Sequence, residues 1–302
     1  MTYQLKHSAI VGGSIAISLY GNPKLPKLLL LGGISGTRHA ITPTGDGWWQ
    51  GLEQAIPLAD YCIVGVDYVG GIGESELQQN NPVADLNQHA KLIAEALIAA
   101  DINTVATVIG GSFGGTVALA LAQQGTITIG QLVIVAAAHR PHASAVILRN
   151  FQRDLLQLAQ TAGNPELGAE LARALAMFSY RSSDALDHYH PQPKQAYDYL
   201  RSRAAQLVAN NPRRTAQLFE QFGPALDNFR LDPQGIVQPT LVIGFTSDQL
   251  APPQLMTEFA EQLSNCAGMH LFESSYGHDG FIKDTANYAS LVRDFLILGN
   301  NT

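Results

Sequence analysis

The stretch TVIGGSFGGTVALA, residues 107–120, places Ser112 among four glycines, between an apolar run and a run of small residues. Residues 110–114 match the pattern Gly-x-Ser-x-Gly, which marks a nucleophile elbow when a strand precedes it and a helix follows. Flanking side chains would collide with neighbouring backbone in so tight a turn, so glycine is favoured there. A glycine-rich turn without chemistry is the alternative. We predict that Ser112 is a catalytic nucleophile.

An acyl-transfer site also needs donors for the oxyanion that forms on attack. A helix beginning after Ser112 directs its first amides at the site, so we expect the Phe113 N–H to be one donor. The second should come from the loop after the strand at 27–31, within LGGIS. We expect Gly32 to supply it, with Leu31 and Gly33 as alternatives.

Short apolar runs of strand length recur along the chain, at 27–31, 61–67, 104–110, 131–138, 240–245 and 268–274. Helical patterns separate them, as after Asn81-Pro82, where apolar residues recur at helical spacing from Leu86 to Leu97. Alternating strands and helices predict a doubly wound α/β fold with a mostly parallel sheet. The early run AIVGGSIAISLY (9–20) is split by VGGS, which indicates a β-hairpin rather than a signal peptide.

The alternation stops for about a hundred residues after 138, where segments such as PELGAELARALAMFSY indicate helices. We expect a core domain formed by 1–138 and 236–302, with 139–235 inserted as a helical lid. The lid contains eleven Lys or Arg and nine Asp or Glu, and the remainder seven and sixteen. Its basic residues form either solvated helix faces or a cationic approach for an anionic substrate or cofactor.

The composition excludes several classes of binding partner. A net charge of −7 without a basic cluster argues against nucleic acid, and no run reaches the roughly 18 apolar residues of a membrane-spanning helix. Cys62 and Cys266 lack the spacing of a zinc or redox pair, which fits a reducing cytoplasm. His139 and His142, and HYH at 188–190, lack a third ligand at recognisable spacing. We expect no metal.

Ser112 needs a base and an orienting acid, and in this fold they follow the serine in the order acid, then histidine. His278 follows the last predicted strand, and Asp248 follows TLVIGFTS. Asp279 and Asp284 are alternative acids, but a neighbour of the histidine points elsewhere, and Asp284 is expected to start the final helix. The sequence therefore predicts a triad of Ser112, Asp248 and His278.

Several motifs together resemble the homoserine O-acyltransferases of the α/β-hydrolase fold, which transfer acetyl or succinyl from coenzyme A to homoserine. They are LGGISGTRH (31–39), GWWQGL (47–52), VGVDYVGGIGES (64–75), GGSFGG (110–115), LAMFSYRS (175–182), TSDQLAPP (246–253) and YGHDGFIK (276–283). Within the family, AHRPHASA and NFQRDLLQLA are more similar to the succinyl branch. The chain departs from its relatives at LDNFRLD (226–232), where they carry Asp-x-His or Asp-His-Asp.

The resemblance implies that Arg181 binds the substrate carboxylate and Asp279 its amine. It implies ping-pong transfer to the homoserine hydroxyl in methionine biosynthesis, with succinyl-CoA favoured over acetyl-CoA as co-substrate and no permanently bound cofactor. It also implies a cytoplasmic enzyme that forms a homodimer through the lid. The alternatives are an esterase, an acyltransferase for another hydroxy amino acid such as serine, and a non-catalytic binding protein of this fold.

Overall fold

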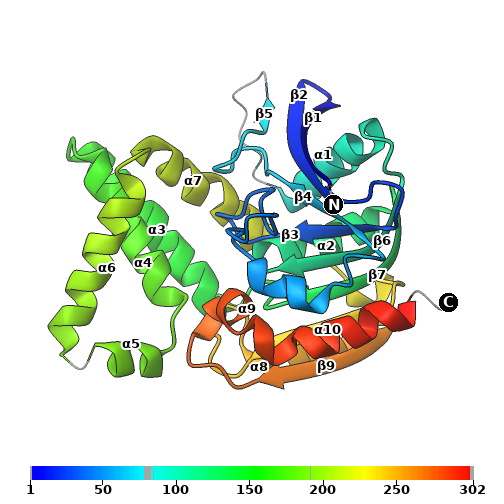
Figure 1. The fold of residues 1–302 in the computed structure, drawn as a ribbon. Coiled ribbons are helices and arrows are strands. Elements are labelled where there is room, and N and C mark those ends of the chain that lie inside the picture. The colour runs from blue at the N-terminus through cyan, green and yellow to red at the C-terminus, as the bar shows by residue number, and fades with distance from the viewer. Residues whose placement is uncertain (1, 78–82, 84, 191, 300–302) are drawn as a thin grey trace.

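The structure is a computed structural model that describes residues 2–77, 83, 85–190 and 192–299. Within this part of the chain, nine strands form one sheet in the order β1-β2-β4-β3-β6-β7-β8-β9, with β5 paired to β2 (Figure 1). They are β1 (Thr2–Ile10), β2 (Gly13–Gly21), β3 (Lys27–Leu31), β4 (Cys62–Val66), β5 (Glu76–Leu77), β6 (Thr104–Gly111), β7 (Thr128–Val135), β8 (Thr240–Phe245) and β9 (Cys266–Phe272). Strands β3, β4 and β6 to β9 pair in parallel, which confirms the predicted α/β fold.

Strand β3 shows why these runs form buried strands. Leu29 and Leu31 pack into a core cluster on one face of the sheet, and Leu28 and Leu30 into a second cluster on the other. Helices cover both faces, so every buried position of the strand, from Leu28 to Leu31, is apolar. The first cluster is covered by α1 (Leu86–Ala99), α2 (Phe113–Gln124) and α8 (Pro253–Gln262), and the second by the 3-10 helix η1 (Gln50–Ala55) and α10 (Thr285–Gly299).

The first two strands form the expected β-hairpin, with a register that runs from Thr2 opposite Gly21 to Ile10 opposite Gly13. Helix α1 is capped by Asp85, whose side chain accepts the Asn87 N–H. The earlier start indicated by Asn81-Pro82 lies outside the described residues. No helix of the described chain has the length and apolar character needed to span a membrane.

In the described part of the chain, five α-helices lie between β7 and β8 and project from the sheet to one side (Figure 1). They are α3 (Ala143–Thr161), α4 (Pro165–Ser179), α5 (Ser183–Tyr189), α6 (Pro193–Val208) and α7 (Pro212–Asn228), followed by the 3-10 helix η2 (Pro233–Gly235). We call this segment, residues 139–235, the lid. Helix α4 packs against α3, α6 and α7 around a small apolar core of its own.

Helix α7 joins the lid to the sheet domain. Its Leu218, Phe222 and Ala225 are buried in the same cluster as α1 and α2. The Phe222 ring stacks on Phe113 with ring centroids 4.6 Å apart. The lid is therefore anchored beside the residue that follows Ser112.

Candidate active site

Ser112 occupies the turn between β6 and α2 with φ 54° and ψ −123°, a left-handed conformation that is strained for a residue with a side chain. The neighbouring glycines have no room for a Cβ. One on Gly110 would lie 2.5 Å from the Gly114 carbonyl oxygen, and one on Gly114 would overlap the Leu31 carbonyl. The glycines thus allow the sharp turn that exposes the serine hydroxyl.

The structure brings Ser112, Asp248 and His278 together. His278 Nδ1 lies 2.7 Å from Asp248 Oδ2, and Nε2 lies 2.7 Å from Ser112 Oγ. A carboxylate only accepts hydrogen bonds, so Nδ1 donates and Nε2 is free to accept the serine proton. The other Asp248 oxygen accepts the N–H groups of Leu250 and Ala251 at 2.8 and 3.0 Å, which fixes the carboxylate. The three side chains come from loops after β6, β8 and β9.

The surroundings favour a charged imidazole. His278 and Asp248 are 5% and 3% exposed. Burial lowers the pKa of His278, but the charge of Asp248 and its hydrogen bond outweigh burial and raise the pKa above its ordinary value. This arrangement stabilises the imidazolium that forms when the histidine takes a proton.

Phe113 begins α2, where the first N–H groups have no intrahelical acceptor. In the β3 loop, Gly33 lines the cavity beside Ser112, and a Cβ on it would lie 3.9 Å from the Ser112 Cβ. The Gly32 carbonyl accepts the hydroxyl of buried Tyr68 at 2.9 Å. A trans peptide directs the Gly33 N–H opposite to that carbonyl, away from Tyr68. We propose Gly33 in place of the expected Gly32 as the second donor.

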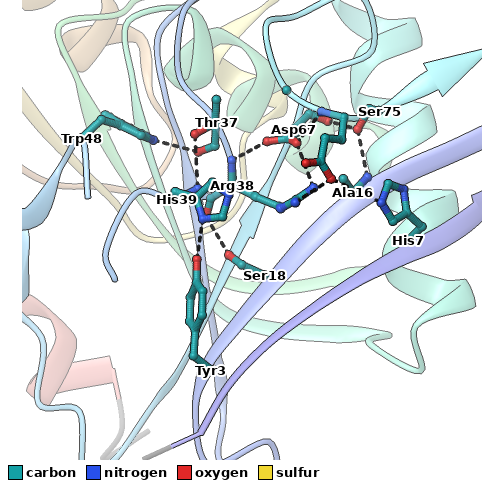
Figure 2. Close-up of polar contacts among 12 residues, drawn as sticks. Tyr3, His7, Ala16, Ser18, Thr37, Arg38, His39, Trp48, Asp67 and Ser75 are labelled. Atoms are coloured by element: carbon teal, nitrogen blue, oxygen red, sulfur yellow. Dashed lines mark hydrogen bonds and ion pairs between the residues drawn. The ribbon is translucent and has the colours of Figure 1, made fainter. Parts of the chain in front are cut away.

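The loop from 32 to 39 is held on the sheet by a buried ion pair (Figure 2). Arg38 contacts Asp67 through Nη1 at 3.2 Å, and its backbone N–H donates to the same carboxylate at 2.6 Å. Its carbonyl accepts the Ser18 hydroxyl at 2.6 Å, and Nη2 reaches exposed Glu74 at 2.7 Å. These contacts position the loop that carries Gly33.

Arg181 and Asp279, the two predicted substrate-binding residues, form an ion pair of 2.9 Å between Nε and Oδ2. Asp279 lines the cavity, and Arg181 is not among the residues of its wall. Burial raises the pKa of Asp279, despite the opposing charges of Arg181 and His278. The Asp279 N–H donates to the Tyr180 carbonyl at 3.1 Å, so the lid segment SYRS docks directly on the histidine loop.

A cavity of about 190 Å³ lies between the lid and the sheet domain, with the Ser112 and His278 side chains in its wall. This is roughly ten times the space that one water molecule needs. Most of its wall is apolar, from residues such as Trp48, Phe219 and Phe281. The polar side chains in the wall are those of Ser35, Ser112, Thr116, Arg140, Arg149, Gln152, Ser179, Tyr180, His278 and Asp279. The described residues contain no cluster of three or more metal-ligating side chains.

Sequence reasoning did not identify Tyr68, Arg149 or Gln152 as site residues. The i, i+3 spacing of Arg149 and Gln152 places them on one face of a helix, and this spacing was visible in the sequence. The direction of that face was not. Tyr68 lies within one of the quoted motifs, but no pattern in the sequence links it to the Gly32 carbonyl.

Residues 26–285 match the profile of the α/β-hydrolase fold. A homoserine O-succinyltransferase from Xanthomonas campestris pv. campestris is 30% identical over 88% of this chain and 74% of its own length. The crystal structure of a homoserine O-acetyltransferase from Staphylococcus aureus superposes with a TM-score of 0.81 at 20% identity, covering 98% of this chain and 95% of that one. Esterase E22 superposes with a TM-score of 0.85 at 16% identity, covering 98% and 99%.

The two structural similarities show the fold alone, because their sequence identities are low. The matched profile covers most of the chain, and the similarity to the Xanthomonas enzyme extends over most of both proteins. The chain therefore belongs to the homoserine O-acyltransferase family of the α/β-hydrolase fold.

Proposed function

We propose that this protein is a homoserine O-acyltransferase that uses acyl-CoA in a step of methionine biosynthesis. The observation that carries the proposal is the chain of two 2.7 Å hydrogen bonds from Asp248 through His278 to Ser112, at the wall of a cavity covered by a lid. Such a triad serves acyl transfer in general, and membership of the family indicates homoserine as the acyl acceptor.

In the first half-reaction, Ser112 Oγ attacks the thioester carbonyl while His278 Nε2 takes the hydroxyl proton. The N–H groups of Phe113 and Gly33 stabilise the oxyanion. The C–S bond then breaks, and the imidazolium returns its proton to the leaving thiolate. Coenzyme A departs with its thiol protonated and leaves an acyl ester on Ser112.

In the second half-reaction, His278 takes the proton of the homoserine γ-hydroxyl as that oxygen attacks the acyl ester. The bond to Ser112 Oγ breaks, and the serine regains its proton from the histidine. Asp279 binds the substrate ammonium, and Arg181 the carboxylate. The raised pKa of Asp279 supports this role, since a buried carboxylate incompletely compensated by Arg181 gains from a second cation.

Transfer instead of hydrolysis requires that water be excluded from the acyl ester. The lid and the apolar wall of the cavity support that exclusion. An esterase of the same fold would hydrolyse the intermediate, and an acyltransferase for serine would accept a shorter hydroxy amino acid. A binding protein without catalysis would not form the ester at all.

The deciding experiment mixes purified protein with acetyl-CoA or succinyl-CoA and measures thiol release and O-acyl product, with homoserine, with serine and without an acceptor. We expect a stoichiometric burst of thiol without acceptor and steady turnover only with homoserine. Steady thiol release without acceptor would identify a hydrolase. Absence of a burst, together with no cleavage of a p-nitrophenyl ester, would identify a binding protein.

We also propose a cytoplasmic homodimer that needs no resident cofactor. Cys62 and Cys266 are both free, as expected in a reducing compartment. Ile147, Phe151 and Leu158 of α3 are more than half exposed and give the lid an apolar face for self-association. Light scattering of the wild type and of Phe151→Asp tests the dimer: we expect twice the chain mass for the wild type and the mass of one chain for the variant.

A further inference from the structure

Two arginines line the cavity, and their hydrogen bonding differs. Arg140 engages both oxygens of Glu258, with Nε at 2.9 Å from Oε1 and Nη2 on the other oxygen. Arg149 uses Nε to contact Asp227 at 2.6 Å, but its Nη2 is buried without a hydrogen-bond partner among the described residues. A buried donor left unpaired is costly, so Arg149 has capacity for one more acceptor.

The charge around Arg149 is also unbalanced. Asp227 is shared with Arg153, whose Nη2 lies 2.7 Å from the second carboxylate oxygen. Two guanidinium groups therefore face one carboxylate, and burial lowers the pKa of Arg149. Arg153 does not line the cavity, so Arg149 is the member of the group that can meet a ligand. A single negative charge placed there would balance the cluster.

Gln152 supplies a second polar group at the same place. It lies one helical turn after Arg149 on α3, is 4% exposed and lines the cavity. Within the described chain its amide has no hydrogen-bond partner. An amide without a partner, beside a guanidinium whose Nη2 is unpaired, suits an acceptor with two oxygens, such as a carboxylate.

The substrates offer two carboxylates for this position. That of homoserine already has a proposed partner in Arg181, next to Asp279. The succinyl group carries the other, at the end of a short chain beyond the reacting carbonyl, whereas an acetyl group ends in a methyl and would leave Arg149 unpaired. Building on the proposed function, we infer that Arg149, assisted by Gln152, binds the terminal carboxylate of a succinyl donor and sets the preference for succinyl-CoA.

The test follows acyl-enzyme formation from each donor without homoserine, by the thiol burst and by the mass of the protein. Arg149→Met should slow acylation by succinyl-CoA at least about tenfold, the effect of one charged hydrogen bond. Acylation by acetyl-CoA should change less than about threefold, which also shows that the variant is folded. Arg149→Lys should restore part of the succinyl rate, because an ammonium keeps the charge without the fork.

Arg140→Met is the matched control, because it removes a cavity-lining guanidinium whose hydrogen bonds are already made; it should affect both donors alike. If Arg149→Met lowers the acylation rate equally with both donors, Arg149 binds the coenzyme A portion, and the inference is wrong. An intact burst with a raised KM for homoserine would reassign Arg149 to the amino acid and overturn it too. If acetyl-CoA acylates the wild type and succinyl-CoA does not, the inference about the succinyl donor is wrong but the proposed function stands. If neither donor acylates the wild type, the proposed function is wrong as well.

Discussion

The sheet domain and the lid present polar groups to the same cavity in different ways. Asp248 and His278 are almost fully buried, and both ring nitrogens of His278 and both carboxylate oxygens of Asp248 take part in hydrogen bonds. The Arg181 side chain is about a fifth exposed and pairs with Asp279, which is available to a substrate. Loops after strands hold the proposed reacting groups in several hydrogen bonds, whereas the lid carries a group with spare hydrogen-bonding capacity, the Nη2 of Arg149.

The two kinds of group suit different functions. Groups held in one geometry by several hydrogen bonds suit bond making and breaking, where small displacements are costly. Groups with spare hydrogen-bonding capacity suit recognition. We therefore expect substitutions of Ser112, Asp248 and His278 to lower the rate with every donor and acceptor, and substitutions of the lid arginines to act on one substrate at a time.

The strongest test of the sheet domain removes the nucleophile. Ser112→Ala should lower kcat by up to about 10⁶, the scale found in serine hydrolases, because no covalent intermediate can form. Mass spectrometry after incubation with acyl-CoA should find no acyl adduct. An adduct on the alanine variant would show that another residue is the nucleophile.

Next in size is the orienting acid. Asp248→Asn should keep the fold but place the wrong tautomer at His278, lowering kcat by up to about 10⁴ by analogy with serine proteases. Acylation and deacylation rates should fall together, since one histidine serves both. A loss of less than tenfold would point to Asp279 or Asp284 as the acid.

The third test concerns stability rather than chemistry. Arg38→Met should destabilise the protein by about 3–5 kcal/mol, because it leaves the carboxylate of Asp67 buried without its cation. Urea unfolding measures the change. Glu74→Gln, on the exposed side of the same arginine, is the control and should change the stability far less. Equal effects of the two variants would mean that the pair does not hold the loop.

In the lid, Arg181→Ala should lower kcat/KM for homoserine at least about tenfold, mainly through KM, because a charged hydrogen bond to the substrate carboxylate is lost. The thiol burst without homoserine should be unchanged, since the first half-reaction involves no amino acid. Arg181→Lys should recover part of the loss. Loss of the burst would show that Arg181 acts on the acyl donor, and it would weaken the contrast between the two regions.

The smallest expected effect is on pH dependence. In the proposed mechanism neutral His278 is the base, so acylation should fall as the pH drops through its raised pKa, above the ordinary histidine value of about 6.5. The carboxylate of Asp279 raises this pKa and the guanidinium of Arg149 lowers it. With acetyl-CoA as donor, Asp279→Asn should therefore move the acid limb to lower pH, and Arg149→Met to higher pH. Acid limbs that coincide with that of the wild type would mean that the charges of Asp279 and Arg149 do not influence the base.

Much of the sheet domain could be predicted from local patterns. Apolar runs such as 27–31 and 240–245 correspond to β3 and β8 at the predicted residues, because a strand buried on both faces is apolar at nearly every position. The turn at Ser112 could be recognised because the steric demand for glycine extends over only five residues. The order serine, acid, histidine then identified Asp248 and His278 as partners.

The contacts of the lid depend on helices that meet only in the folded chain. Arg149 and Asp227 lie 78 residues apart, and no spacing rule predicts that α7 brings them together. The choice between Gly32 and Gly33 likewise rests on which peptide carbonyl Tyr68 contacts. The sequence by itself determined the strands, the nucleophile turn and the order of the triad, since these follow from short-range sterics and burial. Only the tertiary structure decided which lid cation keeps an unpaired nitrogen in the cavity, because charge balance is a property of side chains distant in sequence and adjacent in space.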